Sequence, residues 1–228
     1  MSVKVTWLGH AALALEIDGT KVLVDPFLTG NPLAAADPDT IEADVILLTH
    51  GHGDHVGDTV AIARRTGAKV IANNEVSIWI ANQGVKDTHG MNPDGAYDFG
   101  FARIALTIAF HSSSMPDGSY GGEPNGILIT TKEGKKLYLA GDTSLFSDMR
   151  LIGEKRIDLA VLPIGGNYTM GPDEALQAVK FIHPNAVLPI HYNTFPVIQA
   201  DVVDWARRVH NETPSKVIVV DPGGSFEV

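Results

Sequence analysis

Three histidines and an aspartate lie within six residues of this chain, directly after a short apolar segment. Residues 45–48 (Val-Ile-Leu-Leu) are β-branched at their start and are followed by Thr49, so they are predicted to form a buried strand. The polar residues that come next are His50, His52, Asp54 and His55. The glycines between them allow sharp turns that bring these side chains towards one point. Imidazole and carboxylate groups together bind zinc and similar divalent ions, so the cluster predicts a metal site.

The number of ligand-type residues in this cluster points to more than one ion. Four ligands from six residues can seldom surround a single ion without strain, whereas two neighbouring ions could share them. The alternative is a polar loop that is merely rich in histidine. Such crowding of ligand-type side chains disfavours that alternative.

Three further residues of the same kind follow other apolar segments. His111 comes after residues 108–110, Asp142 after residues 137–141, and His191 after residues 187–190. Ligands at the ends of buried strands stand on a rigid scaffold, as a preorganised metal site requires. Taken singly, each could equally be a solvated strand cap. Together with the histidine cluster, they become candidate ligands.

The composition limits which ligands and partners are available. The chain of 228 residues contains no cysteine, so a metal must be held by His, Asp or Glu. A hydrophobic content of 44% and a charged content of 19% are typical of a globular protein, and the length suits a single domain over residues 1–228. The formal net charge is −10, and the sequence has no basic track like that of a nucleic-acid-binding protein.

The N-terminal sequence lacks a basic segment followed by an apolar signal region, and no apolar stretch is long enough to span a bilayer. A cytoplasmic protein without membrane or nucleic-acid partners is therefore expected. A homo-oligomer is compatible with the sequence.

Short apolar segments alternate with helical patterns along the whole chain. Strands are predicted at residues 3–8, 12–17, 21–24, 45–48, 70–72, 96–110 (two strands broken at Gly100), 127–131, 136–140, 159–163, 186–190 and 216–220. Helices are predicted at residues 58–65, 75–82, 145–152, 172–182 and 197–210. This alternation predicts two mixed β-sheets packed together with helices outside.

The order of the candidate ligands, H-x-H-x-D-H followed by a single His, a Gly-Asp pair and a late His, resembles that of the metallo-β-lactamase superfamily. Residues 7–10, 25–27, 141–143 and 163–167 are also similar to motifs of its prokaryotic metal-dependent hydrolase branch, which is similar to ascorbate-6-phosphate lactonase. The resemblance implies an α/β (α+β) fold, a four-layer αββα sandwich of two mixed sheets with a two-metal site at one edge.

The resemblance also implies a division of the ligands between two divalent ions. His50, His52 and His111 would hold the first ion. Asp54, His55 and His191 would hold the second, and Asp142 would bridge the two. Zinc is the expected metal, with manganese, iron or nickel as alternatives.

This ligand set predicts a metal-dependent hydrolase. Two divalent ions would keep the site net positive, so it could bind and deprotonate a bridging water. Asp54 is the candidate catalytic residue, because its free carboxylate oxygen could orient the resulting hydroxide or carry a proton. The expected substrate is a small ester, lactone or phosphoester, and it could be anionic.

Three other residues are candidate substrate contacts, namely His10, Asn167 and Tyr192. For His10, which lies in a turn between two predicted strands, an exposed turn histidine is an equal alternative. Two other functions stay open at this point: a nuclease or phosphodiesterase of the same fold, and a non-catalytic protein that only holds metal.

Overall fold

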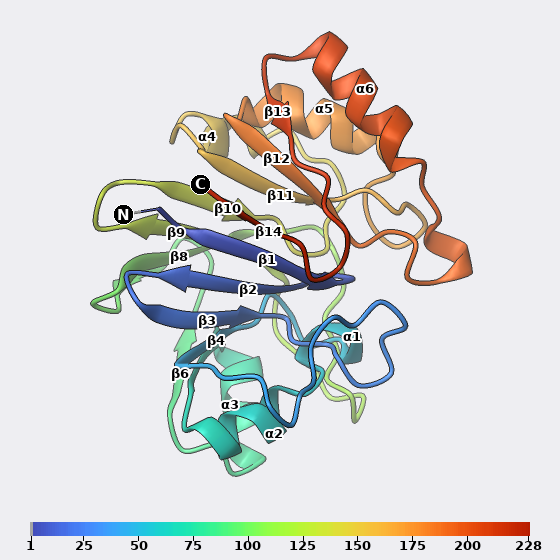
Figure 1. Ribbon diagram of the computed structural model, residues 1–228. Coiled ribbons are helices and arrows are strands. Elements are labelled where there is room, and N and C mark those ends of the chain that lie inside the picture. Colours follow the sequence, from blue (N-terminus) through green and yellow to red (C-terminus); the bar gives the residue numbers. More distant parts are fainter. Residues whose placement is uncertain (1) are drawn as a thin grey trace.

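The computed structural model describes residues 2–228 and contains two seven-stranded sheets that face each other, with helices on their outer sides (Figure 1). The strands of the first sheet are, in spatial order, β14 (Ser225–Glu227), β1 (Lys4–Gly9), β2 (Ala12–Ile17), β3 (Thr20–Val24), β4 (Val45–Leu47), β5 (Lys69–Asn73) and β6 (Thr88–Met91). Those of the second sheet are β13 (Lys216–Val217), β12 (Ala186–Ile190), β11 (Leu159–Pro163), β10 (Lys136–Leu139), β9 (Asn125–Thr131), β8 (Ala102–Ile108) and β7 (Ala96–Asp98).

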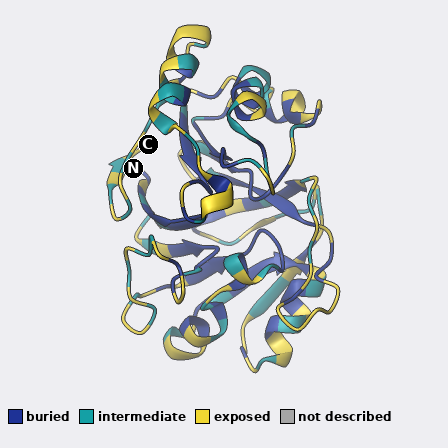
Figure 2. Cartoon of the chain, turned by 90° about the vertical axis from the view of Figure 1, so that its right-hand side faces the viewer, coloured by how far each residue is buried: buried dark blue, intermediate teal, exposed yellow. Residues whose placement is uncertain are grey.

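The helices form the two outer layers, so the predicted αββα sandwich is confirmed. Helices α2 (Thr59–Thr66) and α3 (Asn74–Asn82) cover the first sheet, at the bottom of Figure 1. On the second sheet lie α4 (Met149–Gly153), α5 (Pro172–Ile182) and α6 (Val202–Glu212). Figure 2 shows buried strands in the middle and exposed faces on the helices. Among the described residues, no helix is long and apolar enough to cross a membrane.

Strand β4 shows why the central strands are apolar along their whole length. Val45 and Leu47 belong to the core that includes the space between the sheets, whereas Ile46 packs in a second core with Ile62 of α2 and Val76 of α3. Successive side chains of a strand point to opposite faces. Because both faces of this sheet are covered, neither set of side chains can be polar.

Each sheet is partly antiparallel and partly parallel, and this topology positions the candidate ligands. Strands β3 to β6 pair in parallel in the first sheet, and β10 to β13 do so in the second. The connections that leave the carboxyl ends of β3, β4, β10 and β12 meet at one edge of the sandwich. Ligand sites in such sheets commonly lie at the carboxyl ends of strands.

Two strands of the first sheet were not predicted. Strand β6 lies in the turn-rich stretch 83–95 and has a single buried residue, Met91, so it lacks a clear hydrophobic alternation. Strand β14 has three residues and follows Pro222 and two glycines. It pairs with β1 and returns the chain to its N-terminal sheet, so residues 216–220 are not the last strand as predicted.

The last long helix starts later than predicted. Residues 196–198 form a separate 3₁₀ turn, and α6 begins at Val202 rather than at residue 197. Asp201 sets this start, because its Oδ1 accepts hydrogen bonds from the backbone N–H groups of Val203 and Asp204. An aspartate at this position satisfies donors that the first turn of a helix leaves unpaired.

Trp205 fixes α6 to the rest of the outer layer. Its side chain is fully buried, and its Nε1–H donates to the carbonyl oxygen of Pro172, 3.1 Å away at the start of α5. Trp205→Ala is expected to lower the free energy of unfolding by about 3–5 kcal/mol, since it removes a large buried ring and leaves a cavity. Urea unfolding measures this loss.

Val203→Ala on the same helix is the control, because Val203 is 74% exposed. We expect it to change the free energy of unfolding by less than about 0.5 kcal/mol. Equal effects of the two substitutions would show that α6 is not held by the buried ring.

Candidate metal centre

The residues of the candidate metal centre come from connections of both sheets. His50 and His52 follow β4, and the four-residue helix α1 (Gly53–Val56) carries Asp54 and His55. The second sheet contributes residues that follow β8, β10 and β12: His111, Asp142 and His191. The structure brings all seven predicted ligands together in two groups, with Asp142 between them.

The first group consists of His50, His52 and His111, whose ligand atoms all lie within 4.8 Å of one another. His50 Nε2 and His52 Nδ1 are 3.0 Å apart, and the His111 ring centroid is 5.1 Å from those of both partners. Burial lowers the pKa of all three imidazoles, most strongly that of His50. Neutral imidazoles keep the lone pair that a metal ligand needs.

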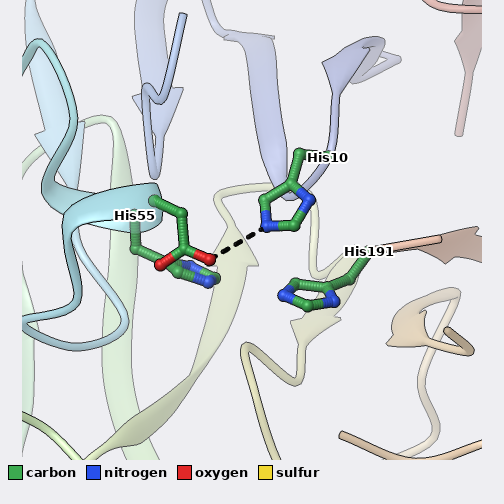
Figure 3. A group of neighbouring side chains, drawn as sticks. His10, His55 and His191 are labelled. Atoms are coloured by element: carbon green, nitrogen blue, oxygen red, sulfur yellow. Dashed lines mark hydrogen bonds and ion pairs between the residues drawn. The ribbon is translucent and has the colours of Figure 1, made fainter. Parts of the chain in front are cut away.

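The second group consists of Asp54, His55, His191 and His10, again with ligand atoms within 4.8 Å of one another. Figure 3 shows the rings of His10, His55 and His191 gathered around one point. His10 Nε2 lies 3.3 Å from Asp54 Oδ2, the contact drawn as a dashed line, and the rings of His10 and His191 are 4.0 Å apart between centroids.

Asp142 contacts members of both groups. Its carboxylate oxygens lie 3.5 Å from His111 Nε2, 3.3 Å from His55 Nε2 and 3.1 Å from His191 Nε2. Burial works against the ionised carboxylate, but the charges of His55 and His191 outweigh it and hold the pKa of Asp142 well below its usual range. The residue is therefore an ionised carboxylate between two sets of imidazoles.

Asp25, which follows β3, orients the imidazole of His55 from behind. Its Oδ2 accepts a hydrogen bond from His55 Nδ1 at 2.8 Å, so His55 Nε2 faces Asp142. Burial alone would lower the pKa of His55, but the carboxylates of Asp142 and Asp25 raise it well above its usual value. A carboxylate behind a ligating histidine fixes the tautomer and makes the imidazole a stronger ligand.

The same carboxylate also orients His50, through Thr49. The Thr49 hydroxyl donates to Asp25 Oδ2 at 2.6 Å, and the Thr49 backbone N–H donates to Oδ1 at 2.9 Å. Since the hydroxyl proton is used in this way, Thr49 Oγ1 accepts from His50 Nδ1 at 3.0 Å. His50 Nε2 then carries the lone pair, on the side of the first group.

Unpaired buried atoms provide a test of whether these residues fit a metal. Among the described residues, seven buried side-chain N or O atoms have no hydrogen-bond partner, and four of them are His55 Nε2, Asp142 Oδ1 and both ring nitrogens of His191. Their ion-pair contacts lack hydrogen-bond geometry. Unpaired buried polar atoms are costly. Three of these atoms, His55 Nε2, Asp142 Oδ1 and His191 Nε2, lie in the cluster, where divalent cations would satisfy them.

The three candidate substrate contacts lie in different environments. His10 is fully buried, with Nδ1 2.9 Å from Thr194 Oγ1, so the alternative of an exposed turn histidine is wrong. Asn167 is exposed on the loop after β11. Tyr192 is 5% exposed and stacks on Trp7, with ring centroids 5.4 Å apart, which leaves little of its surface for a substrate.

Sequence reasoning gave no role to Asp25, Thr49 or Thr194. For Asp25 a signal was available, because it follows a predicted strand directly, as the candidate ligands do. The roles of Thr49 and Thr194 depend on hydrogen bonds to histidines, and for Thr194 the partner His10 is 184 positions away in the chain. A threonine in the sequence does not reveal such a partner.

Comparisons with known proteins agree with this fold and cluster. Residues 4–191 match the family described as the Beta-lactamase superfamily domain. A UPF0173 metal-dependent hydrolase of Shouchella clausii is 54% identical over 205 residues, covering 87% of this chain and 90% of the relative. A UPF0173 metal-dependent hydrolase of Thermus thermophilus is 46% identical over 226 residues, covering 96% of this chain and 100% of the relative.

Solved structures give the same result. A metallo hydrolase from the hyperthermophilic archaeon Ignicoccus hospitalis superimposes with a TM-score of 0.92 at 39% identity and covers 100% of this chain and 99% of its own. An isothiocyanate hydrolase from Delia radicum gut bacteria has a TM-score of 0.79 at 21% identity, covering 98% of each chain, and shares the fold.

Fold, ligand order and comparisons together define the class of this protein as a hydrolase of the metallo-β-lactamase superfamily. Within that superfamily the chain belongs to the UPF0173 family of metal-dependent hydrolases. The predicted superfamily and the predicted enzyme class are confirmed.

Asp25→Asn tests the orienting role of the carboxylate. An amide nitrogen facing His55 would donate to Nδ1 and turn an N–H at Nε2 towards Asp142, the wrong tautomer for a ligand. We expect metal affinity to fall by about 10- to 100-fold. Competition with a chromophoric chelator measures it. Asp39→Asn, at an exposed aspartate, should leave the affinity unchanged. Equal affinities of all three proteins would contradict the role.

Proposed function

We propose that this enzyme holds two divalent ions and hydrolyses a small ester, lactone or phosphoester. The observation that carries the proposal is the position of Asp142, whose carboxylate contacts histidines of both groups. In this proposal His50, His52 and His111 hold one ion, while Asp54, His55 and His191 hold the other. Zinc suits these nitrogen and oxygen ligands, and manganese, iron or nickel could replace it.

When bound, such ions would lower the pKa of a water ligand to about 7 and polarise a substrate oxygen. Asp54 would direct the attacking water and carry a proton to the leaving group. Its side chain is 36% exposed and therefore accessible to substrate, unlike the buried carboxylate of Asp142. Burial disfavours its ionised form, but the hydrogen bond from His10 holds the pKa of Asp54 below its usual range.

His10 would act as a positioning residue for Asp54. Burial lowers the pKa of His10 to about 4, so its ring is neutral at neutral pH. A neutral ring that donates from Nε2 to Asp54 must accept at Nδ1, and Thr194 Oγ1 lies 2.9 Å from that atom. Asp54 would then keep its second oxygen for the reacting groups.

The charge of the chain supports a small substrate. At −10, the protein lacks the basic track that would replace the counterions of a nucleic acid. A small anion could reach a positive metal centre without crossing much negative surface. Cytoplasmic location, a single domain over residues 1–228 and a homo-oligomer remain predictions.

A substrate panel tests this function. The metal-loaded enzyme is assayed with esters, lactones and bis-p-nitrophenyl phosphate, and in parallel with single-stranded RNA and DNA, at low and moderate salt. We expect turnover of at least one small class and little cleavage of the polymers. Efficient cleavage of RNA or DNA, with no hydrolysis of the esters, lactones or bis-p-nitrophenyl phosphate, would identify a nuclease instead.

The metal content tests the two-ion proposal. We expect about two equivalents per chain after loading and about one in His52→Ala, because His52 belongs to the first group alone. Elemental analysis measures both. His210→Ala, at an exposed histidine of α6, should keep two equivalents of metal per chain. A single equivalent in the unaltered protein, even with excess metal, would exclude the second ion.

Asp54→Asn separates proton handling from metal binding. The amide is nearly isosteric but is a weaker ligand and takes up no proton, so kcat should fall by roughly 100-fold or more while most of the metal stays bound. Asp142→Ala should lose metal and activity together. Turnover near that of the unaltered enzyme in Asp54→Asn would refute the role in proton transfer.

A further inference from the structure

A cavity of about 260 Å³ adjoins the metal centre on the side of His111. His111 forms part of its wall, and the Nε2 atom of the same residue lies 3.5 Å from Asp142. The remainder of the wall is mainly apolar, with Ile108, Phe110, Pro93 and Pro124. The cavity and the cluster where bond cleavage is proposed thus share one residue, His111.

The apolar side chains of this cavity are unusually exposed. Ile108, the last residue of β8, is 38% exposed, and Phe110, two residues further on, is 58% exposed. Exposed apolar side chains gathered beside a site commonly mark a surface that a ligand covers.

Phe110 is held in place by the loop that carries Asp142. The Phe110 backbone N–H donates to Thr143 Oγ1 at 3.0 Å, and the Ser144 N–H donates to the Phe110 carbonyl oxygen at 3.0 Å. The Phe110 ring also contacts the ring of Phe146 edge-on, with centroids 5.3 Å apart. The exposed ring therefore has a defined position relative to the metal centre.

In the part of the chain that the structure describes, one Asp, Glu, Lys or Arg side chain lines the cavity, and it is acidic. Glu123 contributes to the wall, and its Oε1 accepts a hydrogen bond from the Tyr120 hydroxyl at 3.1 Å. Within residues 2–228, no lysine or arginine lines the cavity. A negatively charged substituent would lose its water here without meeting a cation.

We propose that the substrate carries an uncharged alkyl or aryl group, which occupies this cavity while the bond to be hydrolysed lies at the histidine cluster. The proposal rests on the hydrolytic function proposed above and names its substrate class. Any anionic part of the substrate would lie at the metal centre, away from Glu123. Phe110 and Ile108 then determine which apolar groups are accepted.

Binding of alkyl hydroxamates to the metal-loaded protein tests the proposal without turnover. The hydroxamate group binds divalent ions, and the series from acetyl to butyryl to hexanoyl extends an apolar tail from that anchor. Calorimetry should show a Kd that falls about two- to fourfold for each added methylene group. Phe110→Ala should make Kd nearly independent of the length of the tail. Tyr97→Ala, at an exposed ring of β7 outside the cavity, should leave the dependence of Kd on tail length unchanged.

A matched charged tail tests the role of Glu123. Succinyl hydroxamate, which ends in a carboxylate, should bind more weakly than pentanoyl hydroxamate. Glu123→Gln should narrow the difference in Kd between the two compounds. A flat series in the unaltered protein, absence of binding, or a series that Phe110→Ala leaves intact would overturn the proposal. Ile108→Ser gives a second test of the same wall should Phe110→Ala fold poorly.

The outcomes also distinguish this proposal from the function on which it rests. If hydroxamates bind with the expected dependence on length but no ester, lactone or phosphoester is hydrolysed, the proposed reaction is wrong and the cavity assignment stands. If p-nitrophenyl acetate and hexanoate are hydrolysed equally well and the hydroxamate series is flat, the cavity assignment alone is wrong.

Discussion

The hydrogen bonds of the Asp25 carboxylate are the constraint on which the candidate metal centre depends. One oxygen accepts from His55 and from the Thr49 hydroxyl, and Thr49 in turn accepts from His50. A single buried carboxylate thereby directs Nε2 of His55 towards Asp142 and Nε2 of His50 towards His52. Without it, either ring could adopt the other tautomer, and the lone pairs would no longer meet.

The mixed sheets provide the positions that this network requires. Asp25 follows β3 and Thr49 follows β4, two neighbouring parallel strands of the first sheet. Asp142 and His191 follow parallel strands of the second sheet. The apolar cores hold these strand ends in place, and the polar side chains gather where the strands stop. The residues that stabilise the core and the residues that form the candidate metal centre are therefore adjacent in the same segments of the chain.

Much of the fold and of the ligand set could be predicted from the sequence, because both leave local patterns. The strand before His50 is a short, continuous apolar run, the helix at 172–182 has a clear apolar periodicity, and the ligand order is distinctive. Strand β14 could not be predicted, since three residues after a proline and two glycines carry no such pattern. Its strand character comes from pairing with β1.

The surroundings of the ligands were the least predictable part of the site. Tyr192 lies next to His191 in the chain, yet its ring stacks on Trp7. His10 is buried beside Asp54, from which it is separated by 44 positions. The cavity beside His111 depends on Pro93 and Pro124, which come from two different loops. Such contacts follow from the packing of the sheets rather than from sequence spacing.

Anomalous diffraction from zinc-loaded crystals tests the central claim most directly, that Asp142 lies between two metal positions. Two peaks roughly 3.5–4 Å apart are expected. One should lie against His50, His52 and His111 and the other against Asp54, His55 and His191, with the Asp142 carboxylate in contact with both. A single peak, or peaks away from Asp142, would contradict it.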